Sequence, residues 1–234
     1  MYYAYQKENV VVLFAIQKNG NKKVALHGQL ILNQYTFSRE QWEMRQYEKP
    51  FEWFGADTPN CLDCKYKGVN GKCYTHKYHS FLSFMYHIKR AKKKVGENPV
   101  PIEKFDWDKL YKEAEGLFIR FGVYGEPVFV PVENMEKLIK KAYTYTGYTH
   151  AWDKYPEYKD LLLASCDGVS EAFRAMSEGW KPYTIIKKKE ELDGNEKNFV
   201  NCPASKEAGQ KTVCSICKLC SPAKSSKPIY ILEH

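Results

Sequence analysis

The segments LFIRF (Leu117–Phe121) and LLLASC (Leu161–Cys166) decide the predicted fold. Both have the length and apolar content of buried strands, and the residues from Pro131 to Tyr143 between them have the length of a helix. A second helix is expected from Ser170 to Ser177, and a further strand follows over residues 183–186. Strands that alternate with helices form a parallel sheet with right-handed crossovers. The sequence therefore predicts an α/β protein built on a parallel sheet or an incomplete (β/α) barrel.

Three shorter elements complete this part of the chain. Asp106 is expected to cap a helix over residues 107–115. Strands are expected over residues 147–152 and 229–232. We interpret residues 101–234 as a βα domain that ends in a cluster of four cysteines.

The N-terminal residues 1–100 predict different elements. The apolar run Val10–Ile16, the turn Asn19–Asn21 and the segment Val24–Leu26 together predict a β-hairpin. Apolar residues at helical spacing predict an amphipathic helix from Phe81 to Ala91, which has basic residues at its end. The first group of cysteines lies between these two elements, and residues 100–105 are expected to form a linker.

The composition limits the class of protein. The chain has 234 residues, of which 36 are basic and 28 acidic, and the net charge is +8. A basic balance favours an anionic partner such as a nucleic acid or a nucleotide. The longest apolar run is far shorter than the roughly 20 residues of a membrane span, and no charged region and cleavage site mark the N-terminus. We therefore expect a cytoplasmic protein without a membrane partner, and the sequence leaves its oligomeric state open.

Eight cysteines are the most informative feature of the composition. In a reducing cytosol, such a number indicates metal or redox chemistry more often than disulfides. Seven of them fall into two groups, which flank a long segment without cysteine, and Cys166 lies apart. The groups are Cys61, Cys64 and Cys73, called the trio below, and Cys202, Cys214, Cys217 and Cys220, called the quartet.

The quartet offers four thiolates, which complete either a zinc site or a four-iron cluster. Its last three members are separated by two residues each. This run resembles ferredoxin ligation more than the two separated pairs of a zinc knuckle. We therefore prefer an iron–sulfur (4Fe-4S) cluster to zinc as the cofactor.

The trio leaves one coordination position open. Three thiolates suit a cluster that binds S-adenosylmethionine at its fourth iron. Alternatively, His76 or His79 completes a Cys3His zinc site, or Cys166 supplies a fourth sulfur. A buried, non-ligating role is preferred for Cys166, because unpaired cysteine is commonly a small core residue.

Polar side chains follow the ends of the predicted strands. Loops at the carboxyl ends of parallel strands converge, and ligands gather there. Arg120, Tyr124, Glu126 and His150 are therefore the candidate catalytic residues, since they would bring a guanidinium, a phenol, a carboxylate and an imidazole together. The alternative is that they are satisfied structural groups.

Several segments resemble an uncharacterised family of bacterial and phage proteins. They are Phe54–Asp57 leading to Cys61–Cys64, Gly71–Tyr74, Ile119–Pro127, Thr146–Trp152, Leu163–Asp167, and Asn201–Gly209 leading to the quartet. This resemblance covers the chain from about residue 54 onward and implies no activity. A cysteine trio before βα units also remotely resembles the radical S-adenosylmethionine enzymes, although the spacing of the trio differs from theirs.

Two functions follow from these features. The first is an iron–sulfur protein whose pocket acts on a nucleotide or nucleic acid, in the manner of a radical S-adenosylmethionine enzyme. The second is a zinc-stabilised module, without enzymatic activity, that binds nucleic acid or protein. The basic runs at residues 89–94 and 187–189 would supply phosphate contacts in either case.

Overall fold

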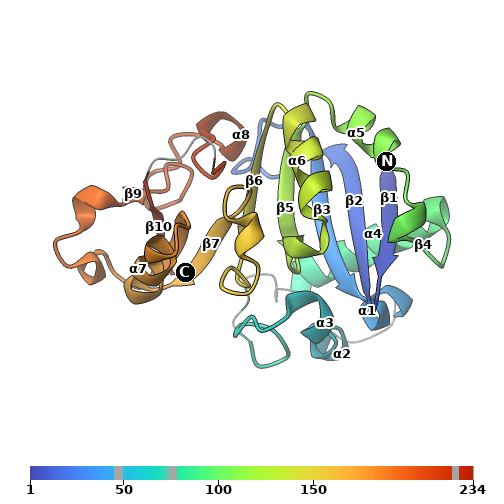
Figure 1. The fold of residues 1–234 in the computed structure, drawn as a ribbon, viewed down its shortest axis with the longest axis horizontal. Coiled ribbons are helices and arrows are strands. Elements are labelled where there is room, and N and C mark those ends of the chain that lie inside the picture. The colour runs from blue at the N-terminus through green and yellow to red at the C-terminus, as the bar shows by residue number, and fades with distance from the viewer. Residues whose placement is uncertain (45–49, 72, 74–77, 223–226, 234) are drawn as a thin grey trace.

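The computed structural model describes residues 1–44, 50–71, 73, 78–222 and 227–233. A sheet of ten strands runs through them in the order β4-β1-β2-β3-β5-β6-β7-β8-β10-β9 (Figure 1). The strands are β1 Tyr2–Lys7, β2 Val10–Lys18, β3 Leu30–Ser38, β4 Val100–Pro101, β5 Phe118–Tyr124, β6 Thr144–Thr149, β7 Leu163–Asp167, β8 Pro182–Ile186, β9 Val200–Asn201 and β10 Ile229–Leu232. Only β2 pairs antiparallel, with β1 and β3, and the other pairs are parallel.

The predicted α/β class with a parallel sheet is therefore confirmed. The order has two ends, so the sheet is open and the barrel alternative is not adopted. Strands from both expected segments, residues 1–100 and 101–234, belong to this one sheet, because β3 pairs with β5.

Helices cover both faces of the sheet (Figure 1). They are α1 Arg39–Glu43, α2 Pro50–Gly55, α3 Thr58–Cys61, α4 Tyr78–Val95, α5 Trp107–Ala114, α6 Val132–Lys141, α7 Val169–Ser177 and α8 Cys214–Cys217. The larger core packs α5, α6 and α7 against one face through Leu110, Leu138 and Ala172. On the opposite face, α4 packs on the N-terminal strands through Phe84 and Ile88. Successive side chains of each strand point to opposite faces of the sheet and therefore contribute alternately to the two cores.

An N-terminal β-hairpin is present, as predicted, but β1 and β2 form it, and Val24–Leu26 takes no part in it. The expected first strand is β2, but β2 pairs with β1 and β3, whereas Val24 and Ala25 lie in a loop. Asn19 does not form a hairpin turn, since its side-chain amide donates to the Ala25 carbonyl at 2.7 Å and closes that loop. Val24 and Ala25 are buried against Phe118. Their apolar character reflects this packing, not strand pairing.

Several boundaries also differ from the predictions, including the following four. The strand expected over 147–152 is β6, which begins and ends three residues earlier. The expected linker over 100–105 contains β4 and a short 3-10 helix over residues 102–104. Gly168 takes the N-cap position of α7, which was expected at Ser170. Asp106 caps α5 as predicted, accepting from the Lys109 amide at 3.0 Å, but the helix ends one residue earlier, at Ala114.

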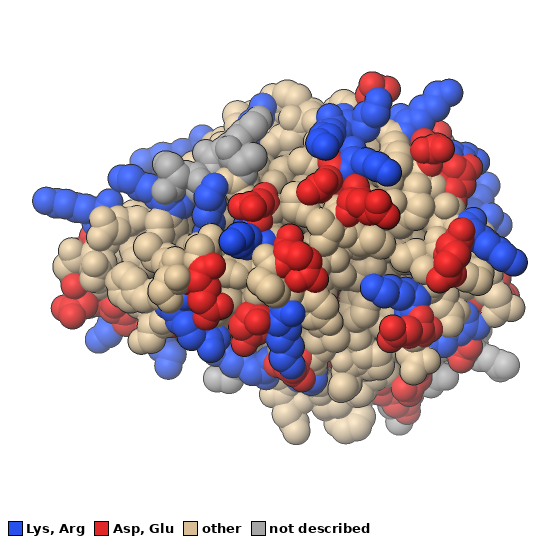
Figure 2. Space-filling view, viewed as in Figure 1, with Lys and Arg blue, Asp and Glu red and all other residues tan. Residues whose placement is uncertain are grey.

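Charged side chains of both signs are interspersed over the face that Figure 2 shows. The basic end of α4 includes Lys92, which pairs with Glu97 at 2.9 Å. Among the described residues, no helix is both long and apolar enough to cross a membrane.

Candidate metal centres

The trio and the quartet lie at opposite ends of the central strands. Cys214 packs with Phe118, the first residue of β5, whereas Cys61 ends α3, which lies beside the last residues of β5 (Figure 1). At about 3.3 Å per residue, a strand of this length separates its two ends by about 20 Å. The seven cysteines therefore belong to two sites.

The quartet is built from two segments. Cys202 directly follows β9, and its amide donates to the Tyr230 carbonyl of β10 at 2.9 Å. Cys214 and Cys217 begin and end α8, and Lys218 after them has a φ of 61°, which turns the chain toward Cys220. The amide of Cys214 donates to the Lys23 carbonyl at 3.2 Å, so α8 rests on the loop between β2 and β3.

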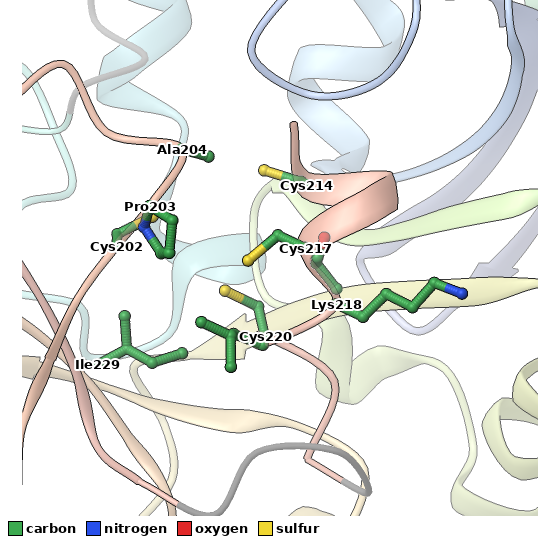
Figure 3. Close-up of a pocket in the computed structure, with 10 residues that line it drawn as sticks. Cys202, Pro203, Ala204, Cys214, Cys217, Lys218, Cys220 and Ile229 are labelled. Carbon is green, nitrogen blue, oxygen red and sulfur yellow. The ribbon is translucent and has the colours of Figure 1, made fainter. Parts of the chain in front are cut away.

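The four cysteines of the quartet line one cavity of about 10 Å³. Figure 3 shows the sulfur atoms of Cys214, Cys217 and Cys220 pointing toward the side on which Cys202 lies. Thr146 of β6 and Ile229 of β10 also line this cavity, so the sheet forms its floor. Its volume is about that needed by a single water molecule.

The surroundings of the quartet act on the thiol pKa values in both directions. Burial raises the pKa of Cys220, and the hydroxyl of Tyr148 lowers it by donating a hydrogen bond to the sulfur. Burial also raises the pKa of Cys202, which the Ala204 amide and the Tyr183 hydroxyl oppose as donors. In metal sites, hydrogen-bond donors of this kind orient the ligating thiolates without contacting the metal themselves.

Two cations contribute from outside the quartet. Burial and the nearby Cys202 raise the pKa of Cys214, while the positive charges of Arg120 and Lys23 lower it. Arg120 was expected beside Tyr124, Glu126 and His150. It lies instead on the strand position that faces Cys214, and it favours the thiolate there.

The trio is fixed by hydrogen bonds between α3 and the sheet. The Asn60 carbonyl accepts from the Glu126 amide at 2.8 Å, and the Asn60 side chain donates to the Thr36 carbonyl at 3.0 Å. The loop after Cys61 then crosses the carboxyl ends of the strands, where Lys65 pairs with Asp167 of β7 at 2.9 Å. This loop places the trio at the strand ends where ligands were expected to gather.

His150 and Glu126 meet beside the trio. Glu126 is 3% exposed; its two carboxylate oxygens accept from the Thr149 hydroxyl at 2.6 Å and from the His150 amide at 3.1 Å. His150 Nδ1 lies 3.4 Å from the same carboxylate, and Nε2 lies 3.0 Å from the Ser165 hydroxyl. Burial lowers the pKa of His150, but hydrogen bonds with Cys64 and Glu126 raise it well above its usual value. The His150 ring therefore contacts a cysteine of the trio.

Cys61 belongs to the same cluster. Burial raises the pKa of its thiol, and the neighbouring Asp57, Glu126, Cys64 and Cys73 raise it further. A cation placed among these groups would relieve their mutual repulsion.

Tyr124 lies deeper than the other candidate catalytic residues. Its hydroxyl accepts from Gln41 Nε2 at 2.8 Å and from Trp53 Nε1 at 3.1 Å, and it donates to Asp57. The side chain is 3% exposed. All of these hydrogen bonds are internal to the core under α4, which favours a structural role for Tyr124.

The three alternative ligands of the trio are placed differently. Cys166 is buried in the core under α7, with Ala172 and Ala175, on the face of β7 opposite to Ser165. His79 lies in α4, but its side chain is outside the described structure, as is the whole of His76.

Several residues of the two sites were not singled out by sequence reasoning. Tyr148, Thr149, Ser165 and Tyr183 contact the sites from β6, β7 and β8. The alternation of side chains along each strand was the available signal, because it puts Thr146 and Tyr148 on one face of β6.

Within the described part of the chain, no group of three or more His, Cys, Asp or Glu side chains is arranged so that it could hold a metal ion. Binding at either site would require the thiols to rotate toward one another. Comparison with protein-family models, curated proteins and solved structures finds no match to this chain. The resemblances drawn from the sequence motifs stay predictions.

Proposed function

We propose that the protein binds metal and that its quartet holds a single zinc ion in a closed, structural site. The observation that carries this proposal is the small cavity lined by Cys202, Cys214, Cys217 and Cys220. Four thiolates complete the tetrahedral coordination that zinc prefers. Donors to the sulfurs and two nearby cations offset part of the negative charge that four thiolates bring.

The size of the cavity favours one ion over a cluster. A volume of about 10 Å³ holds one body of the size of a water molecule. A four-iron core with its sulfides is several times larger, and it would have to push α8 away from β6. The iron–sulfur cluster that the cysteine spacing favours is therefore the competing proposal, and S-adenosylmethionine rests on the open coordination position of the trio and on the remote family resemblance.

A metal in the quartet would stabilise the C-terminal part of the sheet. On the side of these strands that carries the quartet, the described residues form a small buried cluster of Leu163, Cys202, Ala204, Cys220 and Ile229. The other side belongs to the larger core, through residues such as Ile186 and Tyr230. Structural zinc contributes about 10–16 kcal/mol of apparent binding free energy in small zinc domains. We propose that coordination of the four thiols adds to the small apolar cluster on this side of the sheet.

Metal analysis of the full chain tests this proposal. The protein is produced once in zinc-supplemented medium and once anaerobically with iron and sulfide, and its metals are counted. We expect zinc to be bound in the first preparation and no brown chromophore to form in the second. In the Cys214→Ser, Cys217→Ser double variant one zinc equivalent is lost, whereas the control Cys166→Ser loses none. A stable brown protein with iron and sulfide would overturn zinc in favour of the cluster.

Binding of nucleic acid stays a prediction of the basic composition. The basic end of α4 is its strongest support, since Arg90 also stacks on the exposed ring of Tyr86 at 4.1 Å. Affinity for single-stranded nucleic acid should then fall steeply with salt. An affinity that does not change between low and moderate salt would remove this part of the proposal.

A further inference from the structure

We infer that the trio and His150 form a second metal site, in which Cys61, Cys64, Cys73 and His150 take one zinc-class divalent ion. Glu126 positions His150 in this site. The inference uses none of the residues of the quartet, so it stands or falls independently of the proposed function.

The first step is the placement of the four side chains. His150 follows β6 and hydrogen-bonds with Cys64, which lies in the loop after α3. The turn after α3 brings Cys61 and Cys64 together, since the Cys64 amide donates to the Cys61 carbonyl at 3.0 Å, and Cys73 lies near enough to interact electrostatically with Cys61. Segments about 90 residues apart in the sequence thus bring three sulfurs and an imidazole to one strand edge. This set is a Cys3His donor set, which zinc binds in structural sites.

The second step is the orientation of the imidazole. Glu126 approaches Nδ1 at 3.4 Å and is held by Thr149 and by the His150 amide. A carboxylate at Nδ1 favours the tautomer that carries its proton there and leaves the Nε2 lone pair for a metal. Nε2 now faces the Ser165 hydroxyl at 3.0 Å, a contact that an ion would replace.

The third step concerns the role of Glu126. A hydrolytic zinc site needs an open position and a general base that can reach the metal-bound water. Both oxygens of Glu126 are already engaged, by Thr149 and by His150. Glu126 is thus a positioning residue, and four protein ligands close the site.

Nearby carboxylates have other partners. Asp57 accepts from Gln41 and Tyr124, and Asp63 pairs with Lys154. Asp167 pairs with Lys65 through Oδ2, while its Oδ1 is buried without a partner among the described residues. Of these neighbours and His150, His150 is the one that hydrogen-bonds with Cys64. His150 is therefore the fourth ligand that the surroundings of the trio favour. Loading replaces three S–H bonds by metal–sulfur bonds and the Nε2–H bond of the protonated His150 ring by a metal–nitrogen bond, so that four protons pass to solvent.

The test counts zinc in the full chain and in matched variants. We expect two equivalents in the wild-type protein, one in His150→Ala, and two in His150→Cys, which restores a fourth ligand. His27→Ala, which changes an exposed histidine of the β2–β3 loop, is the control and keeps two. The Cys214→Ser, Cys217→Ser variant keeps the zinc of the trio. X-ray absorption of that variant should show three sulfurs at about 2.3 Å and one nitrogen at about 2.0 Å.

The possible failures are distinguishable. If His150→Ala keeps both equivalents, or if His76→Ala or His79→Ala loses one instead, His150 is not the fourth ligand. Should His150→Ala fail to fold, the absorption spectrum of the quartet variant decides, because four sulfurs or no nitrogen overturns the inference. A quartet variant that keeps two zinc ions contradicts the proposed function but leaves the second site intact.

Discussion

His87 should make the stability of the protein depend on pH. It is a buried residue of α4, and its two ring nitrogens lie 3.3 Å from the Tyr2 hydroxyl and 3.4 Å from the Tyr35 hydroxyl. Burial, and to a lesser extent the positive charge of Arg90, lowers the pKa of His87 from 6.5 to about 4. The folded protein therefore holds this imidazole neutral where the unfolded chain protonates it.

The sign and the size of the effect follow from this difference in pKa. As the pH falls below 6.5, His87 is protonated in the unfolded state, whereas in the folded state it stays neutral until the pH reaches about 4. The contribution of His87 is complete above pH 6.5 and is lost as the pH falls toward 4. At about 1.4 kcal/mol per pKa unit, the full loss is about 3 kcal/mol, and about 2 kcal/mol is lost by pH 5.

Urea unfolding at several pH values measures this effect. The variant His87→Gln keeps a donor and an acceptor at this position but cannot be protonated. We compare the change in unfolding free energy between pH 7.5 and pH 5, so that any constant cost of the substitution cancels. His87→Gln should lose about 2 kcal/mol less than the wild type over this range. The exposed His27→Gln is the control, and it should behave as the wild type does.

Equal losses in the wild type and in His87→Gln would refute the reasoning. In that case the histidine would be protonated in the folded state as easily as in the unfolded one. The contacts with Tyr2 and Tyr35 would then not describe the packing of α4 in solution.

Four further predictions concern the sites. Glu126→Gln should weaken zinc binding at the trio by about 10–100-fold in a competition titration, whereas Asp153→Asn, on the neighbouring surface, should leave it unchanged. Gly125→Ala should destabilise the fold by about 2 kcal/mol or more in urea unfolding, because φ is +69° and the new Cβ would lie 2.5 Å from the Thr36 carbonyl oxygen. Cys166→Val should keep both zinc ions and cost less than about 1.5 kcal/mol; loss of a zinc ion would make Cys166 a ligand. A strong chelator should lower the melting temperature of the wild type, and an unchanged melting temperature would argue against structural metal.

The central strands could be predicted because their signals are local. The runs that became β5 and β7 are apolar on both faces, as expected where helices cover both sides of a sheet. Asp106 and the periodic apolar residues of α4 are local signals too. Each of these predictions needed only a few neighbouring residues.

The N-terminal pairing could not be predicted in the same way. β1 was not predicted, because its sequence contains no continuous apolar run like that of β2. Its Tyr5 is nevertheless fully buried. Tertiary packing decides which segment pairs with β2. Val24 packs against Phe118 in a buried cluster and is therefore not part of a strand beside β2. A strand-like apolar segment can thus end in a loop when another element requires its side chains.

The same limit applies to the sites. Cysteine spacing identified both groups from the sequence, but the residue that we propose as the fourth ligand of the trio, His150, follows β6, far away along the chain. His150 was recognised as a candidate from its position after a strand, while its proximity to Cys64 depends on the path of the loop over β5, β6 and β7. Only the paired strands reveal that Arg120 faces the quartet and Glu126 the trio.

The positions of the two sites suggest why one chain would need both. The strands at the two edges of the sheet, β4 and β9, have two residues each, and β9 is followed at once by Cys202. The described residues 62–71 after α3 and 203–213 after β9 form turns and bends, without helix or strand of their own. Each segment lies between cysteines of one group, and each group lies against long central strands. Metal coordination at both places would therefore fix the two irregular segments to the rigid part of the sheet, because a closed four-ligand site restrains the chain at every ligand.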